Sequence, residues 1–246
     1  MSETVQFDAT WRSLAAVHGG VLLGTMMSAA ARAADSIPRV ISAHLLQAVR
    51  PATPMDVTAE LDRSGAMGSV RVEIHQRSRL SVVARVLTIR GAPAIDRWPE
   101  SPPSSVAEGE GEPFLPPLDL VPVGQHMEVR AIGPNRPLGG GSVPELDAWV
   151  RLVDELDPLV QLGIVMDALP PSLLATRTTP LFQPTVEFTA HLSGVIPDPR
   201  AWMRVTQRTD WYDGGLAMDE GLVRDGRGAT IAQVRQARRV ITPIDE

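Results

Sequence analysis

The sequence predicts an α+β protein made of two copies of one plan, in which an antiparallel sheet wraps a buried helix. Three observations lead to this fold class. A proline-rich stretch divides the 246 residues into halves of similar length. Each half contains one segment that is apolar on nearly every side, which is typical of a buried helix. Each such segment is followed by several runs of β-branched residues with partial alternation, which predict antiparallel strands.

The first half contains a complete unit of this kind. Its helix is predicted over residues 18–30, in the segment HGGVLLGTMMSAA. One strand is expected before the helix, over residues 9–14, and four after it, over residues 41–46, 55–61, 69–76 and 81–90. Ser64-Gly65 and Arg77-Ser78 fall in the turns expected between the later strands.

The second half repeats the unit in the same order. Its helix is predicted over residues 157–169, where Asp157 suits an N-cap and Pro158 the first helical position. Laid over the first helix, it matches Gly24 with Gly163 and Met27 with Met166. Strands are expected over residues 127–132, 146–152, 185–192, 201–208, 218–225 and 229–240, with Asp225-Gly226 as a hairpin turn.

A linker separates the two units. Residues 91–118 contain seven prolines and a run of alternating Glu and Gly. Such a composition fits neither a helix nor the interior of a sheet. We therefore expect an N-terminal domain over residues 1–100, a linker over residues 101–121 and a C-terminal domain over residues 122–246.

Composition excludes several classes of function. The net charge of −6 and the isoelectric point near 5.4 argue against a nucleic-acid partner. The chain has no cysteine, so disulfides, thiolate metal sites and a cysteine nucleophile are excluded, and all its basic residues are arginines. The start shows no secretory leader, and no apolar run approaches the roughly 18 residues of a membrane helix. These features predict a cytoplasmic protein without membrane insertion.

Common catalytic motifs are missing from the sequence. It has no GxSxG elbow, no GxGxxG at a strand–helix junction and no HExxH. The five histidines, each expected at the surface or at a helix end, show no spacing typical of metal ligands. No metal site and no cofactor are therefore expected.

Three polar residues stand where apolar residues are expected. Asp167 lies in the apolar run IVMDAL, where a buried carboxylate needs partners or must be held in its neutral form. Gln236 shares a strand face with Ala232 and Val234, and Thr185 opens its strand directly after a proline. Each has an ordinary structural explanation when taken alone, such as capping a loop or satisfying a backbone group.

The order of these segments resembles the thioesterase II family, the double-hotdog acyl-CoA thioesterases. The resemblance covers nearly the whole chain apart from the linker, and it is carried by HGGVLLGTMMSAA, LLQAVRPATPMDVTAELDRSG, RPLGGGSVPELDAWVRL, GIVMDAL, PTVEFTAHLSG and DGRGATIAQVRQARRV. It implies a double hotdog, an acyl-CoA substrate and hydrolysis of its thioester bond. It also implies an active site formed by an Asp late in the second helix, a Thr on the next strand and a Gln on the last strand. These match Asp167, Thr185 and Gln236.

Direct attack by water is the simplest chemistry for such a site. Asp167 would take the proton of the water, and Thr185 and Gln236 would orient it. Gly19-Gly20, at the start of the first helix, is the best candidate for an oxyanion donor because glycine lets a substrate approach the backbone closely. Close packing of the helix against the sheet explains the two glycines equally well.

Two other functions stay open. A hotdog hydratase or dehydratase acting on enoyl thioesters would pair His18 with Asp167, but it would leave Thr185 and Gln236 without a role. A non-catalytic acyl-CoA-binding hotdog would bind its ligand without releasing a thiol.

Alignment of the halves places Ser28 opposite Asp167, Thr88 opposite Gln236 and Ser42 near Thr185. Neither Ser nor Thr serves as a base near neutral pH without a partner, so only the second half is expected to be catalytic. Hotdog sheets expose apolar surface, which predicts a homodimer or a higher homo-oligomer.

Overall fold

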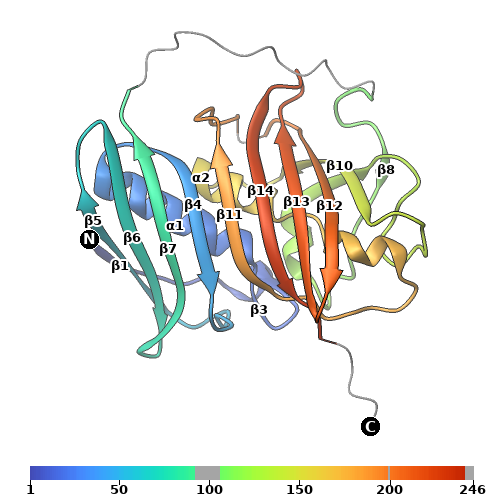
Figure 1. Cartoon of the computed structure of the whole chain (residues 1–246), viewed down its shortest axis with the longest axis horizontal. Helices are drawn as coiled ribbons and strands as arrows, with labels where there is room; N and C mark the ends of the chain where they lie inside the picture. Colours follow the sequence, from blue (N-terminus) through green and yellow to red (C-terminus); the bar gives the residue numbers. More distant parts are fainter. Residues whose placement is uncertain (92–105, 199, 242–246) are drawn as a thin grey trace.

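The computed structural model of the protein describes residues 1–91, 106–198 and 200–241. In these residues one antiparallel sheet of 12 strands forms the body of the molecule (Figure 1). From one edge to the middle run β1 (Ser2–Val5), β5 (Met55–Arg63), β6 (Met67–Gln76), β7 (Arg79–Ile89) and β4 (Ile37–Leu45). From the middle to the other edge run β11 (Thr185–Leu192), β14 (Thr230–Arg239), β13 (Leu216–Arg224), β12 (Met203–Asp213), β10 (Glu145–Leu152), β9 (Met127–Ala131) and β8 (Glu112–Pro113).

The two halves of the sheet follow the same plan. In the first half the order is β1-β5-β6-β7-β4, and in the second it is β10-β12-β13-β14-β11. The halves meet where β4 pairs antiparallel with β11, and Ser42 lies directly opposite Thr189 with their hydroxyl oxygens 3.0 Å apart. The expected α+β architecture is therefore confirmed, and its two tandem sheets, each wrapping one helix, are joined into one.

Both long helices lie on one face of the sheet, behind the strands in the view of Figure 1. They are α1 (Gly19–Ala34) and α2 (Pro158–Met166), and most residues of both are buried. Glycines let the two backbones touch: a Cβ on Gly20 would come within 2.4 Å of the carbonyl oxygen of Gly163, and one on Gly24 within 2.4 Å of the Cα of Val160. The helix pair thus brings the start of α1 beside the end of α2.

The N-terminal segment differs from the expected strand over residues 9–14. Asp8 caps a 3₁₀ helix, η1 (Ala9–Trp11), by accepting a hydrogen bond from the Thr10 N–H, and only the short β2 (Arg12–Ser13) follows, paired with β3 (Ala16–Val17). A side chain that bonds its own backbone two residues on favours a turn over a strand. The edge strand β1 lies farther toward the N-terminus.

The linker lies partly outside the described residues, which resume at residue 106. The part that is described supplies the edge strand β8, and η2 (Pro122–His126) follows it. Proline is tolerated at a sheet edge, where its missing N–H breaks no ladder. The boundaries expected for the two domains and the linker stay a prediction.

The strand registers correct part of the alignment between the halves. β4 and β11 each have an irregularity near the start, between Pro38 and Val40 and between Thr185 and Glu187. Matching these irregularities puts the counterparts elsewhere than expected: Thr185 with Pro38, Thr189 with Ser42, Gln236 with Val86 and Arg238 with Thr88. The sequence alignment was two residues out of register on the last strand, because the counterparts are identified by the pairing between strands, which the sequence does not show. The helix alignment is consistent with the N-caps His18 and Asp157, and it still pairs Ser28 with Asp167.

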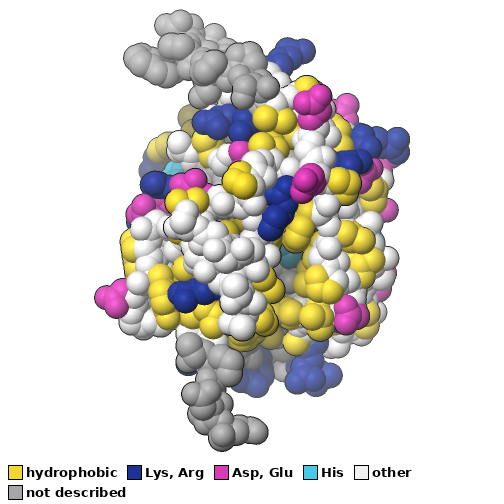
Figure 2. Space-filling model, turned by 90° about the vertical axis from the view of Figure 1, so that its right-hand side faces the viewer, with side chains coloured by type: hydrophobic (Ala, Val, Ile, Leu, Met, Phe, Trp, Pro, Cys, Tyr) yellow, Lys and Arg dark blue, Asp and Glu magenta, His cyan; other side chains and the backbone are white. Residues whose placement is uncertain are grey.

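Surface side chains are mixed in character. On the face shown in Figure 2, arginines and acidic residues are interspersed with hydrophobic side chains. Across the described ranges, neither long helix has the length and apolar character required to span a bilayer. The outer side of the central strands carries polar residues such as His44 and His191. The oligomeric state stays a prediction.

Candidate active site

Asp167 lies immediately after α2, at its C-cap, and its carboxylate faces the start of α1. Its side chain is 10% exposed. The backbone N–H of Gly20 donates a hydrogen bond to Asp167 Oδ2 over 3.0 Å. The partner required for a buried carboxylate at this position is therefore the helix N-terminus of the other half, where the dipole favours negative charge.

The two glycines at this helix start make room for the carboxylate. A Cβ on Gly19 would lie only 2.8 Å from Asp167 Oδ2, so any larger residue would displace the carboxylate. Gly20 contributes its N–H to Asp167 in this structure, a role that the sequence did not suggest. The oxyanion role expected for Gly19 and Gly20 stays a prediction, and the N–H of Gly20 has to leave Asp167 to serve it.

His18 is the N-cap residue of α1 and lies against the same aspartate. Its Nε2 is 3.0 Å from the main-chain oxygen of Asp167 and 3.5 Å from Oδ2. A carbonyl oxygen only accepts hydrogen bonds, so Nε2 carries a proton in this arrangement. His18 therefore acts as a donor toward Asp167. The sequence expected a surface or helix-end histidine, and His18 is a buried helix-end residue.

Thr185 and Gln236 form a hydrogen-bonded pair on neighbouring strands. Thr185 opens β11 just before its irregularity, and Gln236 lies on the helix-facing side of β14 with only 1% of its surface exposed. The Thr185 hydroxyl donates to Gln236 Oε1 over 3.1 Å. The structure thus brings together two of the three predicted site residues directly.

Arg238 connects this pair to Asp167. Its Nη1 donates to Thr185 Oγ1 over 2.9 Å, and its Nη2 lies 3.7 Å from Asp167 Oδ1. Because a guanidinium only donates, the Thr185 hydroxyl accepts a hydrogen bond from Arg238 and donates its own hydrogen bond to Gln236. The hydrogen-bond chain therefore runs in one direction, and the amide nitrogen of Gln236 is its donor end.

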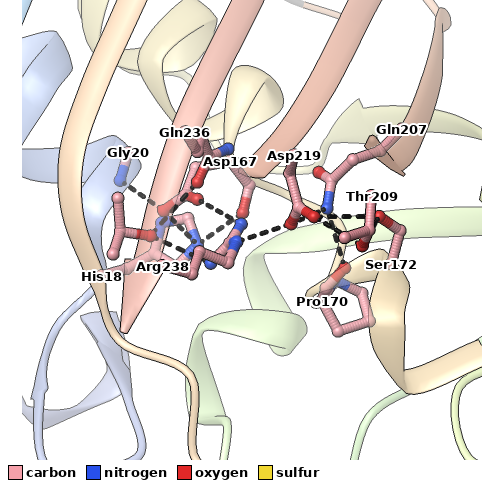
Figure 3. Close-up of polar contacts among 11 residues, drawn as sticks. His18, Gly20, Asp167, Pro170, Ser172, Gln207, Thr209, Asp219, Gln236 and Arg238 are labelled. Carbon is pink, nitrogen blue, oxygen red and sulfur yellow. Dashed lines mark hydrogen bonds and ion pairs between the residues drawn. The ribbon is translucent and has the colours of Figure 1, made fainter. Parts of the chain in front are cut away.

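A buried carboxylate anchors Arg238 from the other side (Figure 3). Asp219, on β13, is 1% exposed, and its Oδ2 accepts a hydrogen bond from Arg238 Nε over 2.8 Å. Thr209 Oγ1 and Gln207 Nε2 donate to the same carboxylate over 2.7 and 3.1 Å. Ser172 Oγ lies 3.2 Å from it. Asp219 therefore has a full set of partners and holds the arginine in one orientation.

The sequence reasoning missed Arg238 and Asp219, although a signal for both was present. On the last strand, the alternation that puts Ala232, Val234 and Gln236 on the inner face also puts Arg238 there. On β13 the same period puts Asp219 on the inner face between Ala217 and Val223. Charged residues at inward positions of two adjacent strands predict a buried ion pair.

No metal site accompanies these residues: within the part of the chain that the structure describes, no three His, Asp or Glu side chains are grouped to hold an ion. A cavity of about 730 Å³ lies elsewhere, lined in part by His191, Gln233 and Arg235. Gln233 and Arg235 point to the opposite side of β14 from Gln236 and Arg238. The arrangement around Asp167 therefore offers acid–base and electrostatic chemistry from the chain's own groups: a carboxylate, a directed hydroxyl–amide chain and a buried guanidinium.

The duplicated sheet with one helix per half, and a polar site where the two helices meet, define a double hotdog of the thioesterase II type. A structure from Thermobifida fusca, assigned provisionally to thioesterase II, shares 22% identity with a TM-score of 0.85, over 98% of this chain and 92% of its own. A hotdog protein of unknown function from Alicyclobacillus acidocaldarius shares 18% identity with a TM-score of 0.86, over 99% and 94%. An acyl-CoA thioesterase II from Mycobacterium marinum shares 18% with a TM-score of 0.75, over 100% and 94%.

Family models match both halves of the chain. Residues 7–91 match the N-terminal domain of acyl-CoA thioesterases, and residues 99–240 match the C-terminal domain. The chain belongs to the acyl-CoA thioesterase family. No curated protein matches its sequence.

Proposed function

We propose that the protein hydrolyses acyl-CoA thioesters to a free fatty acid and coenzyme A by direct attack of water. The observation that carries this proposal is the convergence of Asp167 with the Thr185–Gln236 pair, which Arg238 links within hydrogen-bond and ion-pair distances. Membership of the acyl-CoA thioesterase family supports the same substrate class.

In this mechanism Asp167 is the general base. The water accepts a hydrogen bond from the amide of Gln236 and donates one to Asp167, so that a lone pair points at the thioester carbon. As the C–O bond forms, the water proton moves to Asp167 and the carbonyl π electrons move to the carbonyl oxygen. When this electron pair returns, the C–S bond breaks, and the departing thiolate takes the proton from Asp167.

Thr185 acts through its neighbour. Its hydroxyl donates a hydrogen bond to Gln236 Oε1 and so fixes the orientation of the amide, which makes Thr185 a positioning residue. Asp167 and Gln236 touch the reacting water. His18 donates to the main-chain oxygen of Asp167 and keeps the carboxylate at the start of α1.

Thiol release across a panel of acyl-CoA chain lengths tests the proposal. We expect the purified protein to release coenzyme A with saturation kinetics. A single turnover in water enriched in heavy oxygen should place the label in the first molecule of fatty acid, because no acyl-enzyme intervenes. Saturable binding of acyl-CoA without any thiol release would instead identify a non-catalytic binding protein.

A hydratase acting on enoyl thioesters is the second candidate, and the contact between His18 and Asp167 favours it. The same protein sample should therefore be offered an enoyl-CoA, with loss of the conjugated double bond and thiol release followed together. Hydration without thiol release would replace the thioesterase proposal. Thiol release without hydration would support it.

A further inference from the structure

One nitrogen of Arg238, Nη2, makes no hydrogen bond and has only an ion-pair contact with Asp167 Oδ1. The Arg238 side chain is 6% exposed, and Nη2 is buried without a hydrogen-bond partner. The other two nitrogens are fixed, Nε by Asp219 and Nη1 by Thr185. A buried charged donor without a hydrogen bond is destabilising, because it has lost its hydration and gained no equivalent partner. A donor that is held this rigidly without a hydrogen bond is positioned to bind a ligand atom.

The position of Nη2 indicates which atom that is. It lies 3.7 Å from Asp167 Oδ1, which is too long for a good hydrogen bond and too close for the two groups to be unrelated. In the tetrahedral intermediate, the former water oxygen and the former carbonyl oxygen are bonded to one carbon. If the first oxygen contacts Asp167, the second falls beside it, within reach of the neighbouring Nη2.

The donor expected from the sequence is occupied. The N–H of Gly20 bonds Asp167 Oδ2, so it is not free for the carbonyl oxygen while Asp167 keeps its place. Figure 3 shows the guanidinium of Arg238 between Asp167 and Asp219, with the Asp219 network on its far side. The charge of Asp219 and its polar partners hold the cation without using Nη2.

We propose that Arg238 is a further catalytic residue, whose Nη2 binds the oxyanion that forms from the thioester carbonyl. The inference rests on the proposed function and adds to it the group that stabilises the transition state. A full positive charge in a water-poor site stabilises a developing negative charge strongly, and it needs no rearrangement because Asp219 has already oriented it. Removing one oxyanion donor typically lowers kcat by about 10²- to 10³-fold.

The experiment compares two non-hydrolysable coenzyme A analogues with the same acyl chain. One carries a difluoromethylene ketone between the acyl chain and coenzyme A, which adds water to form a hydrate that presents an oxyanion when it ionises; the other is a thioether without a carbonyl. For Arg238→Gln we expect kcat and the affinity for the ketone to fall together by about 10²- to 10³-fold. The affinity for the thioether, measured by calorimetry, should change by less than about threefold.

Two further variants keep the test decisive. Arg238→Lys keeps a cation beside Asp219 in case the Gln variant does not fold; because a lysine has no second nitrogen to offer, its ketone affinity should still fall far more than its thioether affinity. Arg235→Gln removes an exposed arginine from the other face of the same strand and should change neither affinity.

The outcomes separate the two proposals. An active wild type whose Arg238 variants lose ketone and thioether affinity equally would show that Arg238 only maintains the structure. An active wild type with unchanged Arg238 variants would also overturn this inference and leave the thioesterase proposal standing. A wild type that releases no thiol from any acyl-CoA would overturn both.

Discussion

We call the inner face of the sheet at β11, β13 and β14 in the second half the polar corner, because its side chains are polar or charged. The matching inner face at β4, β6 and β7 in the first half is nearly apolar. Both corners have the same strand order and the same irregularity of register. The second half carries Thr185, Asp219, Gln236 and Arg238, and their counterparts in the first half are Pro38, Val70, Val86 and Thr88. The first half therefore shows that this fold does not require a buried ion network at this place.

The difference also extends to the helix ends. Asp167 faces the N-cap residue His18, and its counterpart Ser28 faces the N-cap residue Asp157, to which it donates a hydrogen bond over 3.0 Å. In the pair of Asp167 and His18 the carboxylate is therefore on the residue near the helix end, whereas in the pair of Ser28 and Asp157 it is on the N-cap residue. In the second half it ends a helix and faces the polar corner, whereas in the first-half site it caps a helix by bonding the N–H groups of Leu159 and Val160.

This comparison supports the proposal that the polar corner serves catalysis. A buried ion pair is seldom more stabilising than well-packed apolar residues of similar volume, because both charges lose their hydration. The first half has mainly apolar residues at these positions, whereas the second half has a buried ion pair. Variants that replace second-half residues by their first-half counterparts therefore test the comparison directly.

The largest effect is expected at Asp167. Asp167→Asn keeps an oxygen that can accept from Gly20 but removes the base, so kcat should fall by about 10²- to 10⁴-fold with little change in thioether-analogue affinity. Steady-state thiol release and calorimetry measure the two quantities. Turnover within a few-fold of the wild type would assign Asp167 a structural role and remove the main chemical difference between the halves.

A large effect on stability is expected at Asp219. Asp219→Val introduces the first-half residue but leaves Arg238 buried without its carboxylate, so the free energy of unfolding should fall by about 3–5 kcal/mol. The double variant Asp219→Val with Arg238→Thr installs both first-half residues and should recover most of this loss while staying inactive. Urea unfolding of the two variants measures the recovery. A double variant less stable than the single one would mean that the network is needed for folding.

Smaller effects on turnover are expected from the hydroxyl–amide chain. Thr185→Ala and Gln236→Ala should each lower kcat by about tenfold, the effect of losing one hydrogen bond in the transition state. The double variant should be little worse than the more affected single variant, because Thr185 acts on the water only through Gln236. Fully additive losses would show that the two residues act on different groups.

Most of the fold could be predicted from the sequence, because apolar helices, alternating strands and a proline-rich divider are local signals. The prediction of a strand over residues 9–14 was wrong, because the turn at Asp8 depends on one hydrogen bond between its side chain and the Thr10 N–H. The position of Asp167 could be predicted, since an acidic residue in an apolar run is visible in one dimension. The link through Arg238 could not be placed in the same way, because it joins α2, β11, β13 and β14, which meet only in the folded chain.

The smallest effect is expected at Ser28, the first-half counterpart of Asp167. Its hydroxyl donates to Asp157 and accepts from Arg32 Nη1 over 2.7 Å, so Ser28→Ala removes both contacts beside the N-terminus of α2. Asp157 keeps its two bonds to the helix backbone, and the free energy of unfolding should therefore fall by only about 1 kcal/mol.

Activity should not follow this loss of stability. Ser28, on α1, lies beside the N-terminus of α2, whereas Asp167 lies at the C-terminus of α2. The hydrogen bonds of Ser28 to Asp157 and Arg32 do not reach the chain of Thr185, Gln236 and Arg238. We expect kcat and KM of Ser28→Ala to stay within about twofold of the wild type in thiol-release assays below the unfolding temperature. If Ser28→Ala abolished activity while Asp167→Asn did not, the assignment of the catalytic site to the second half, with Asp167 as its base, would be wrong.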